Sequence, residues 1–206
     1  MTEPASSFHL ASASGGLPSA VGWAQLLMRD RIRPGDIVVD ATAGNGHDTL
    51  FLAGLVGEAG HVYAVDVQEA AVKETRRRLA EAGIEEGRAS VVCAGHEGLR
   101  QIVRQEHHGR VKGVMFNLGY LPGSDKSLIT RTETTLQAVA AALDVLAPGG
   151  LLTVAVYPGH EGGAEEQRAI GEWAGGLSPR GFEAQLFRPV NRAASPPECW
   201  AVLKKA

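Results

Sequence analysis

The segment Ile37–Leu50, IVVDATAGNGHDTL, decides the fold of this chain. An apolar run ends at Asp40, a loop of small residues with Gly44 and Gly46 follows, and an apolar helical pattern begins near His47. This order predicts a strand, a tight glycine turn and the N-terminus of a helix. Glycine lets the backbone approach a ligand closely, and the free N–H groups of a helix start face it. We therefore expect a ligand site at the end of this strand.

A second apolar run, residues 61–65, ends in Asp66. A carboxylate at this position can accept hydrogen bonds from both hydroxyl groups of a ribose, so the two motifs together predict a nucleoside cofactor. A dinucleotide fingerprint requires G-x-G-x-x-G, but Thr49 stands where the third glycine belongs, which disfavours NAD. Asp40, an acidic residue before the loop, favours S-adenosylmethionine. The alternative is a plain strand-to-helix turn that binds nothing.

Apolar runs alternate with helical patterns along the rest of the chain. Strands are expected at residues 37–40, 61–66, 89–93, 111–116, 150–157, 182–188 and 199–204. Helices are expected near residues 19–31, 47–56, 68–82, 97–106, 132–146 and 164–176. Pro148-Gly149-Gly150 is expected to end the helix before the fifth strand.

The alternation of strands and helices implies a parallel sheet with helices on both faces, closed by an antiparallel hairpin of the last two strands. The predicted fold class is therefore α/β, a Rossmann-like class I methyltransferase fold with a seven-stranded, mostly parallel sheet. Residues 17–206 are expected to form a single S-adenosylmethionine-dependent methyltransferase domain, and residues 1–16, rich in serine, alanine and glycine, to form a mobile N-terminal segment.

The composition indicates an ordinary globular protein without a strongly basic surface. A formal net charge of −3 argues against a broad nucleic-acid coat, although it allows a local basic patch. Cys93 and Cys199 lie in apolar runs and are expected to be buried free thiols, which fits a reducing cytoplasm. The N-terminus does not resemble a secretion signal, and no apolar run approaches the ~20 residues of a membrane span. Whether the chain is a monomer or a homodimer is left open.

The fourth strand leads into the most informative loop, Phe116–Ser127, FNLGYLPGSDKS. Its Asn117-Leu118-Gly119-Tyr120 resembles the Asn-Pro-Pro-Tyr signature of methyltransferases that act on amino nitrogens. A target amine must aim its lone pair along the sulfur–methyl bond, and an asparagine side chain with a nearby backbone carbonyl can accept its hydrogens. Tyr120 could stack on a base. The alternative is that Asn117 is a turn residue and Tyr120 packs locally.

Other residues at the carboxyl ends of the strands have two interpretations each. His96 contacts the adenine or caps the following helix, and His160 is a structural histidine or lies at the ligand. Asp125 and Lys126 bind substrate or form a solvated ion pair. Basic residues that could meet phosphate are Lys126, Arg131, Arg188 and Arg192, whereas Arg76-Arg77-Arg78 is expected to be a solvated helix face. No metal site is expected.

Four segments of the chain together resemble a known family: DATAGNGHDTLFLA, FNLGYLPGSDKSLITRTETT, YPGHEGG and NRAASPPECWAV. They are similar to the MnmM/YtqB-like family, long labelled rRNA methylases, over residues 17–204. The resemblance implies an S-adenosylmethionine-dependent enzyme that methylates 5-aminomethyl-2-thiouridine at the tRNA wobble position. Pro158 and Glu198 depart from the family pattern, which usually has histidine and an apolar or aromatic residue there, and leave the exact substrate open.

The resemblance and the residue patterns described above together give a set of expected site residues. Those expected to bind the cofactor are Asp40, Gly44, Asn45, Gly46, His47, Asp66, Gln68, His96, Asn117 and Leu118. Those expected at the transfer site are Asn117, Tyr120, Asp125 and His160, with Asp125 and His160 as alternative general bases. Those expected to bind the substrate, a tRNA anticodon loop, are Gly119, Tyr120, Lys126, Arg131 and Arg192.

Rival functions are methylation of rRNA, a small amine or a protein, a non-catalytic cofactor-binding module that grips RNA, and an NAD dehydrogenase. Asn117 with Tyr120 favours an enzyme over the idle module. The sequence does not identify the tRNA species or the general base.

Overall fold

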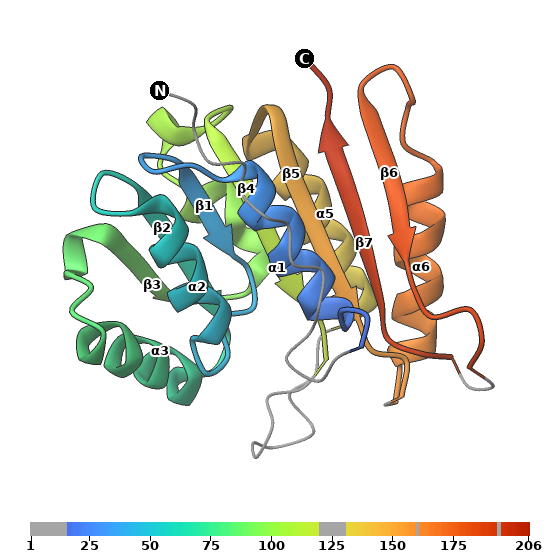
Figure 1. Ribbon diagram of the computed structural model, residues 1–206, viewed down its shortest axis with the longest axis horizontal. Coiled ribbons are helices and arrows are strands. Elements are labelled where there is room, and N and C mark those ends of the chain that lie inside the picture. Colours follow the sequence, from blue (N-terminus) through green and yellow to red (C-terminus); the bar gives the residue numbers. More distant parts are fainter. Residues whose placement is uncertain (1–15, 120–130, 160, 193–194) are drawn as a thin grey trace.

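A twisted seven-stranded sheet with helices on both faces forms the molecule (Figure 1). The computed structural model describes residues 16–119, 131–159, 161–192 and 195–206. The strand order is β3-β2-β1-β4-β5-β7-β6. The strands are β1 (Ile37–Asp40), β2 (His61–Asp66), β3 (Ala89–Cys93), β4 (Val111–Asn117), β5 (Leu146–Val156), β6 (Phe182–Phe187) and β7 (Glu198–Lys204). The pairs among β1 to β5 are parallel, and β7 is antiparallel to both β5 and β6. The predicted fold class, including the closing hairpin, is confirmed.

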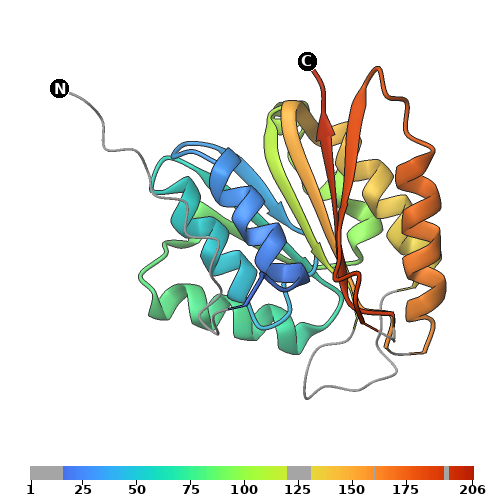
Figure 2. The same cartoon turned by 45° about the vertical axis from the view of Figure 1, so that its right-hand side comes forward.

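Two helical layers cover the sheet, as Figure 2 shows from the side. One layer contains α1 (Ala20–Arg31), α2 (His47–Val56) and α3 (Glu69–Glu81), and the other contains α4 (Leu99–Ile102), α5 (Thr132–Val145) and α6 (Gly163–Gly175). The sheet separates two apolar cores because successive strand side chains point to opposite faces. Val38 packs with the α1 layer and Val39 with the α5 layer. This burial on both faces explains why β1 is apolar without alternation.

The prediction of one continuous helix near residues 97–106 is wrong. The segment divides into a 3₁₀ turn η2 (His96–Gly98), the short α4, and a second turn η3 (Gln105–His107). The backbone N–H and the guanidinium of Arg104 both donate to the hydroxyl of Tyr63, over 3.3 Å and 3.0 Å. A tertiary partner thus replaces the intrahelical hydrogen bonds that would continue the helix.

Pro148-Gly149-Gly150 does not end the helix as predicted. Helix α5 already ends at Val145, and Leu146 is paired with Val111 in the sheet. Pairing resumes at Leu151 with Gly113, so the three residues form an excursion within the range of β5. The ammonium group of Lys204 binds the carbonyl oxygens of Leu143 and Leu146 at 2.7 Å and 2.9 Å, which stabilises the helix end.

The prediction of two buried thiols is right for Cys199 and wrong for Cys93. Cys93 is the last residue of β3, and β3 lies at the edge of the sheet. An edge position leaves the end of the strand exposed, and the Cys93 thiol faces the carbonyl oxygen of Val67 at 3.5 Å. Among the described residues, no helix is long and apolar enough to cross a membrane.

Candidate active site at the carboxyl ends of the strands

Strand register places Asp66 and Asn117 on either side of the glycine loop. Asp40, the last residue of β1, is level with Ala64 on β2 and with Met115 on β4. Asp66 and Asn117 each stand two residues further along their strands. Two strand spacings of ~4.8 Å separate these strands, so their backbones are roughly 10 Å apart across the loop. The two predicted chemical groups therefore share one edge of the sheet.

Asp66 is half-buried and holds the backbone on both sides of it. Its Oδ2 atom accepts a hydrogen bond from the N–H of Gly44 at 2.9 Å, and its Oδ1 atom accepts one from the N–H of Gln68 at 2.9 Å. Both oxygens retain lone pairs that can accept further hydrogen bonds. A carboxylate held this way, beside a glycine loop, fits the ribose of a nucleoside cofactor.

The glycine loop needs glycine at Gly46 for two reasons. Its φ of 77° lies in the left-handed region, and a Cβ atom there would lie 2.9 Å from Cα of Thr75 on α3. Thr75 also donates its hydroxyl to the carbonyl oxygen of Gly44 at 3.1 Å. Arg78 donates Nε to the carbonyl oxygen of Asn45 at 2.7 Å. Arg78 thus supports the loop, which corrects the prediction that Arg76-Arg77-Arg78 is only a solvated face.

Asp40 supports the glycine loop from the buried side. It is 1% exposed, accepts hydrogen bonds from the N–H of Thr42 at 3.2 Å and the hydroxyl of Thr49 at 2.6 Å, and so connects the strand end to helix α2. Burial raises the pKa of Asp40 to about 7, with a further contribution from the charge of Asp48. Its depth makes Asp40 a residue that supports the loop backbone. Its role in cofactor binding stays a prediction.

His96 is buried, and its ring lies against the loop after β1. The imidazole faces the backbone of Ala41 and meets the ring of Phe116 edge-on, with centroids 5.7 Å apart. Burial lowers the pKa of His96, which favours the neutral ring. The residue that caps η2 is Gly95, so the capping alternative for the His96 side chain is wrong. The predicted adenine contact stays a prediction.

The transfer side of the loop is formed by the end of β4. The backbone N–H of Asn117 donates to the hydroxyl of Thr42 at 2.7 Å, while its side chain is exposed. Leu118 is buried in the core, and its N–H donates to the carbonyl oxygen of Ala155 at 2.9 Å. Gly119 has a φ of 136°. Asn117 is therefore held by its backbone and faces the site with its side chain.

Asp48, which the sequence did not single out, interacts with Gln25, Asn117 and Tyr157. It lies in the first turn of α2, where it accepts a hydrogen bond from Gln25 of α1 at 2.7 Å and faces the Asn117 side chain. Tyr157 follows β5, and its pKa is raised by burial and by the charge of Asp48. The sequence feature that could have identified Asp48 is its position next to His47 in the glycine-loop motif. Nothing in the sequence pointed to Gln25, which lies 92 residues before Asn117.

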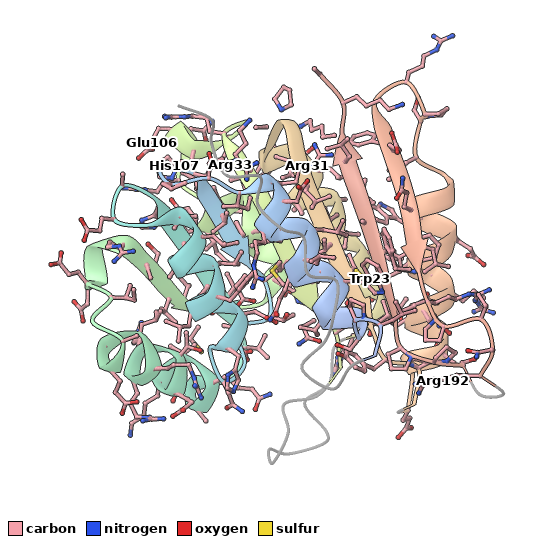
Figure 3. The ribbon with its side chains drawn as sticks, viewed as in Figure 1. Trp23, Arg31, Arg33, Glu106, His107 and Arg192 are labelled. Carbon is pink, nitrogen blue, oxygen red and sulfur yellow. The ribbon has the colours of Figure 1, made fainter. Side chains whose placement is uncertain are left out.

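The structure places some of the remaining predicted residues and leaves others outside its described ranges. His47 is exposed at the start of α2, and Arg131 is the exposed N-cap of α5. Arg192 is exposed at the same end of the molecule as Trp23 (Figure 3). The predictions for Tyr120, Asp125, Lys126 and His160 fall on residues outside the described ranges. In the described part of the chain, no three histidine, cysteine, aspartate or glutamate side chains could hold a metal ion together.

Glu198, one of the two departures noted in the sequence, is buried at this edge. It is level with Val156 of β5 and accepts a hydrogen bond from the indole of Trp200 at 2.7 Å. Gly171 of α6 lies against the same indole. Glu198 therefore helps to orient Trp200 between the sheet and α6. Pro158, the other departure, is half-buried after β5.

Comparisons with known proteins agree with this geometry. The model of the family described as "Putative rRNA methylase" matches residues 62–203. A curated protein of Arabidopsis thaliana, named tRNA (mnm(5)s(2)U34)-methyltransferase, chloroplastic, is 38% identical over 88% of this chain and 68% of its own length.

Two solved structures are similar over nearly their whole length. A protein described as "putative rRNA-methylase" from Clostridium thermocellum is 37% identical with a TM-score of 0.86, and the match covers 92% of this chain and 99% of that one. A protein described as "a putative methyltransferase" from Streptococcus mutans, solved in complex with SAH, is 32% identical with a TM-score of 0.81 and the same coverage.

Proposed function

The chain belongs to the family described as "Putative rRNA methylase", and we propose that it methylates the amino nitrogen of 5-aminomethyl-2-thiouridine at the wobble position of tRNA. The chain is an S-adenosylmethionine-dependent methyltransferase, and the predicted activity and cofactor are confirmed. The substrate is supported by the name of the Arabidopsis thaliana relative and by the amide group at the transfer edge.

The observation that carries the proposal is the position of Asn117. It lies level with Asp66 across the glycine loop, with its backbone bonded to Thr42 and its side chain exposed. Asp66 suits the ribose hydroxyls, and the backbone of Gly44 to Gly46 suits the methionine part of the cofactor. Asn117 then lies on the side of the loop from which we propose that the target nitrogen approaches.

Amide chemistry suits an amine better than a carbon or a ribose hydroxyl. The oxygen of Asn117 can accept an N–H of a neutral amine and so direct its lone pair. The bound cofactor supplies a methyl group on a sulfonium: the lone pair forms the N–C bond, the C–S electron pair stays on sulfur, and the product leaves as a protonated secondary amine. Because the cofactor is already activated, the protein's task is to align the two partners and to select the neutral amine.

The surface that we propose for the anticodon loop is aromatic and basic and lies at the same level of the sheet. Asn117 is level with Ala155, Ala155 with Cys199, and Cys199 with Phe187, the last residue of β6. Phe187 stacks on Trp23 of α1 with ring centroids 4.9 Å apart. The exposed side chains that follow β6 include Arg188 and Arg192.

Such aromatic and guanidinium groups stack on unpaired bases and meet phosphates. The wobble base is unpaired in a free anticodon loop, so presenting it costs little. This surface therefore supports an RNA loop as the substrate in a protein whose net charge is only −3.

The test uses purified protein, methyl-labelled S-adenosylmethionine and two tRNA preparations, one bearing 5-aminomethyl-2-thiouridine and one bearing unmodified uridine at the wobble position. Label should enter only the first, and nucleoside mass spectrometry should identify the 5-methylaminomethyl product. Asn117→Ala serves as the inactive control, and Gln137→Ala, an exposed amide on α5, as the surface control.

The family description makes ribosomal RNA the second candidate substrate. Labelling of ribosomal RNA alone, or equal labelling of both tRNA preparations, would overturn the wobble-uridine assignment. The methyltransferase activity itself would stand in either case.

A further inference from the structure

Asp48 is a buried carboxylate to which the transfer chemistry above assigns no role. It is the second residue of α2 and is 7% exposed. Its Oδ1 atom accepts a hydrogen bond of 2.7 Å from Nε2 of Gln25 on α1, and the side-chain amide of Asn117 faces the same carboxylate. Asp48 thus links two helices to the strand that carries Asn117.

This contact determines the orientation of the Asn117 amide. A side-chain amide has a donor end, Nδ2, and an acceptor end, Oδ1, whereas an ionised carboxylate can only accept. Asn117 therefore turns Nδ2 toward Asp48, which leaves Oδ1 facing away from the carboxylate. The backbone position of Asn117 is held separately, by the hydrogen bond from its N–H to Thr42. Asp48 therefore determines only which end of the amide, Nδ2 or Oδ1, faces the site.

We propose that Asp48 is a positioning residue that orients Asn117 so that its carbonyl oxygen receives an N–H of the target amine. The proposal rests on the proposed function. With this orientation, the amine donates a hydrogen to Oδ1 and its lone pair stays free for the methyl group. The opposite flip would present the Nδ2 donor to the lone pair and compete with methyl transfer.

The role requires an ionised Asp48. A protonated carboxyl group can donate its hydrogen to Oδ1 of Asn117 and so favour the unproductive flip. Burial raises the pKa of Asp48. Three neighbours act in the opposite direction and lower this pKa: the amides of Gln25 and Asn117, and the charge of His47. The other titratable groups that interact with Asp48 are Asp40 on β1 and Tyr157 after β5. Turnover should therefore fall as the pH drops through the pKa of Asp48.

The test compares Asp48→Ala with Asp48→Asn in tRNA methylation at saturating cofactor and RNA. Asp48→Ala removes the acceptor and should lower kcat at least about tenfold, while the Kd for S-adenosylmethionine stays unchanged. Asp48→Asn keeps an oxygen that can accept from Asn117 but adds an NH₂ group that can donate to its Oδ1, so its kcat should lie between those of wild type and Asp48→Ala. Asp144→Asn, an exposed carboxylate on α5, is the surface control.

The pH profile separates positioning from a merely structural role. The target amine must be neutral in every variant, so its protonation lowers kcat at acidic pH in the same way in all of them. Below the pKa of Asp48, the slope of log kcat against pH should be about one unit steeper in wild type than in Asp48→Asn. Wild-type turnover by Asp48→Ala overturns the proposal. So does an Asp48→Asn variant that is as slow as Asp48→Ala and keeps the wild-type slope.

A nitrogen–proton NMR titration of the free protein tests the contact without any substrate. The side-chain NH₂ signals of Asn117, identified by their absence in Asn117→Ala, should shift as Asp48 titrates and stay fixed in Asp48→Asn. Failure of wild type to label tRNA would refute the proposed function, and the titration would still decide the role of Asp48. Asn117 signals that do not respond to pH in wild type overturn the proposal, even if Asp48→Ala does not fold.

Discussion

The two sides of the glycine loop hold their carboxylates in different ways. On the cofactor side, Asp66 is half-buried and engages the backbone N–H groups of Gly44 and Gln68. On the transfer side, Asp48 is buried and engages the neutral side-chain amides of Gln25 and Asn117. The first arrangement leaves a charge near solvent where hydroxyl groups can bind it. The second uses a charge to orient a neutral group, so mutations on the two sides should affect different steps.

The largest effect is expected from Asn117→Ala. Loss of the group that orients the amine should lower kcat by about a hundredfold, because misplacement of a reacting group is expensive in rate. Affinity for S-adenosylmethionine, measured by calorimetry, should stay at the wild-type value. A variant with wild-type kcat would remove Asn117 from the transfer step.

Asp66→Ala should show the opposite pattern. Two charge-assisted hydrogen bonds to the ribose, at roughly 1.5–3 kcal/mol each, disappear, so the Kd for S-adenosylmethionine should rise at least about tenfold. Glu69→Ala, an exposed carboxylate at the start of α3, should leave the Kd unchanged. Equal cofactor affinity in Asp66→Ala and wild type would place the ribose elsewhere.

Gly46→Ala tests whether the loop between the two sides is sterically fixed. The positive φ and the Cβ contact with Thr75 should lower the free energy of unfolding by about 2 kcal/mol. Gly54→Ala, in the middle of α2 with open space around its Cβ, should instead stabilise the protein by about 0.5–1 kcal/mol. Urea unfolding measures both, and equal effects of the two changes would contradict the described loop.

Asp40 should make stability depend on pH in a defined window. Its pKa is raised from 3.8 to about 7 in the folded protein, so its contribution to stability is complete below pH 4 and is lost as the pH rises through about 7. A single proton limits this slope to about 1.4 kcal/mol per pH unit. Unfolding curves of Asp40→Asn should show a smaller slope than wild type between these pH values, because Asp48, whose pKa is also raised by burial, still contributes.

The smallest effect is expected from Arg192→Ala. An exposed guanidinium that meets a phosphate should contribute a few-fold to tRNA affinity, and its loss should reduce the slope of log affinity against log salt by about one. Arg31→Ala is the matched control, because Arg31 lies at the opposite edge of the sheet from Arg192 (Figure 3). Equal losses in both variants would point to a diffuse electrostatic effect, and no loss in either would place the RNA elsewhere.

Much of the fold was predictable because it depends on local patterns. The strand, glycine loop and helix at residues 37–56 follow from an apolar run, two positive-φ glycines and a helical period, and the structure has the same bounds for β1 and α2. The helix near residues 97–106 was not predictable in the same way. Its interruption depends on the hydroxyl of Tyr63, which lies 41 residues before Arg104.

The sequence by itself determined the order of the strands and helices, the glycine loop, and the residues that end β2 and β4 at one edge of the sheet. Periodicity and turn chemistry act over a few residues, so they can be recognised in the chain. Only the tertiary structure decided that Gln25 and Asn117 meet at the buried carboxylate of Asp48. That meeting depends on strand register and on the packing of α1 against α2, which join segments far apart in sequence and leave no local pattern.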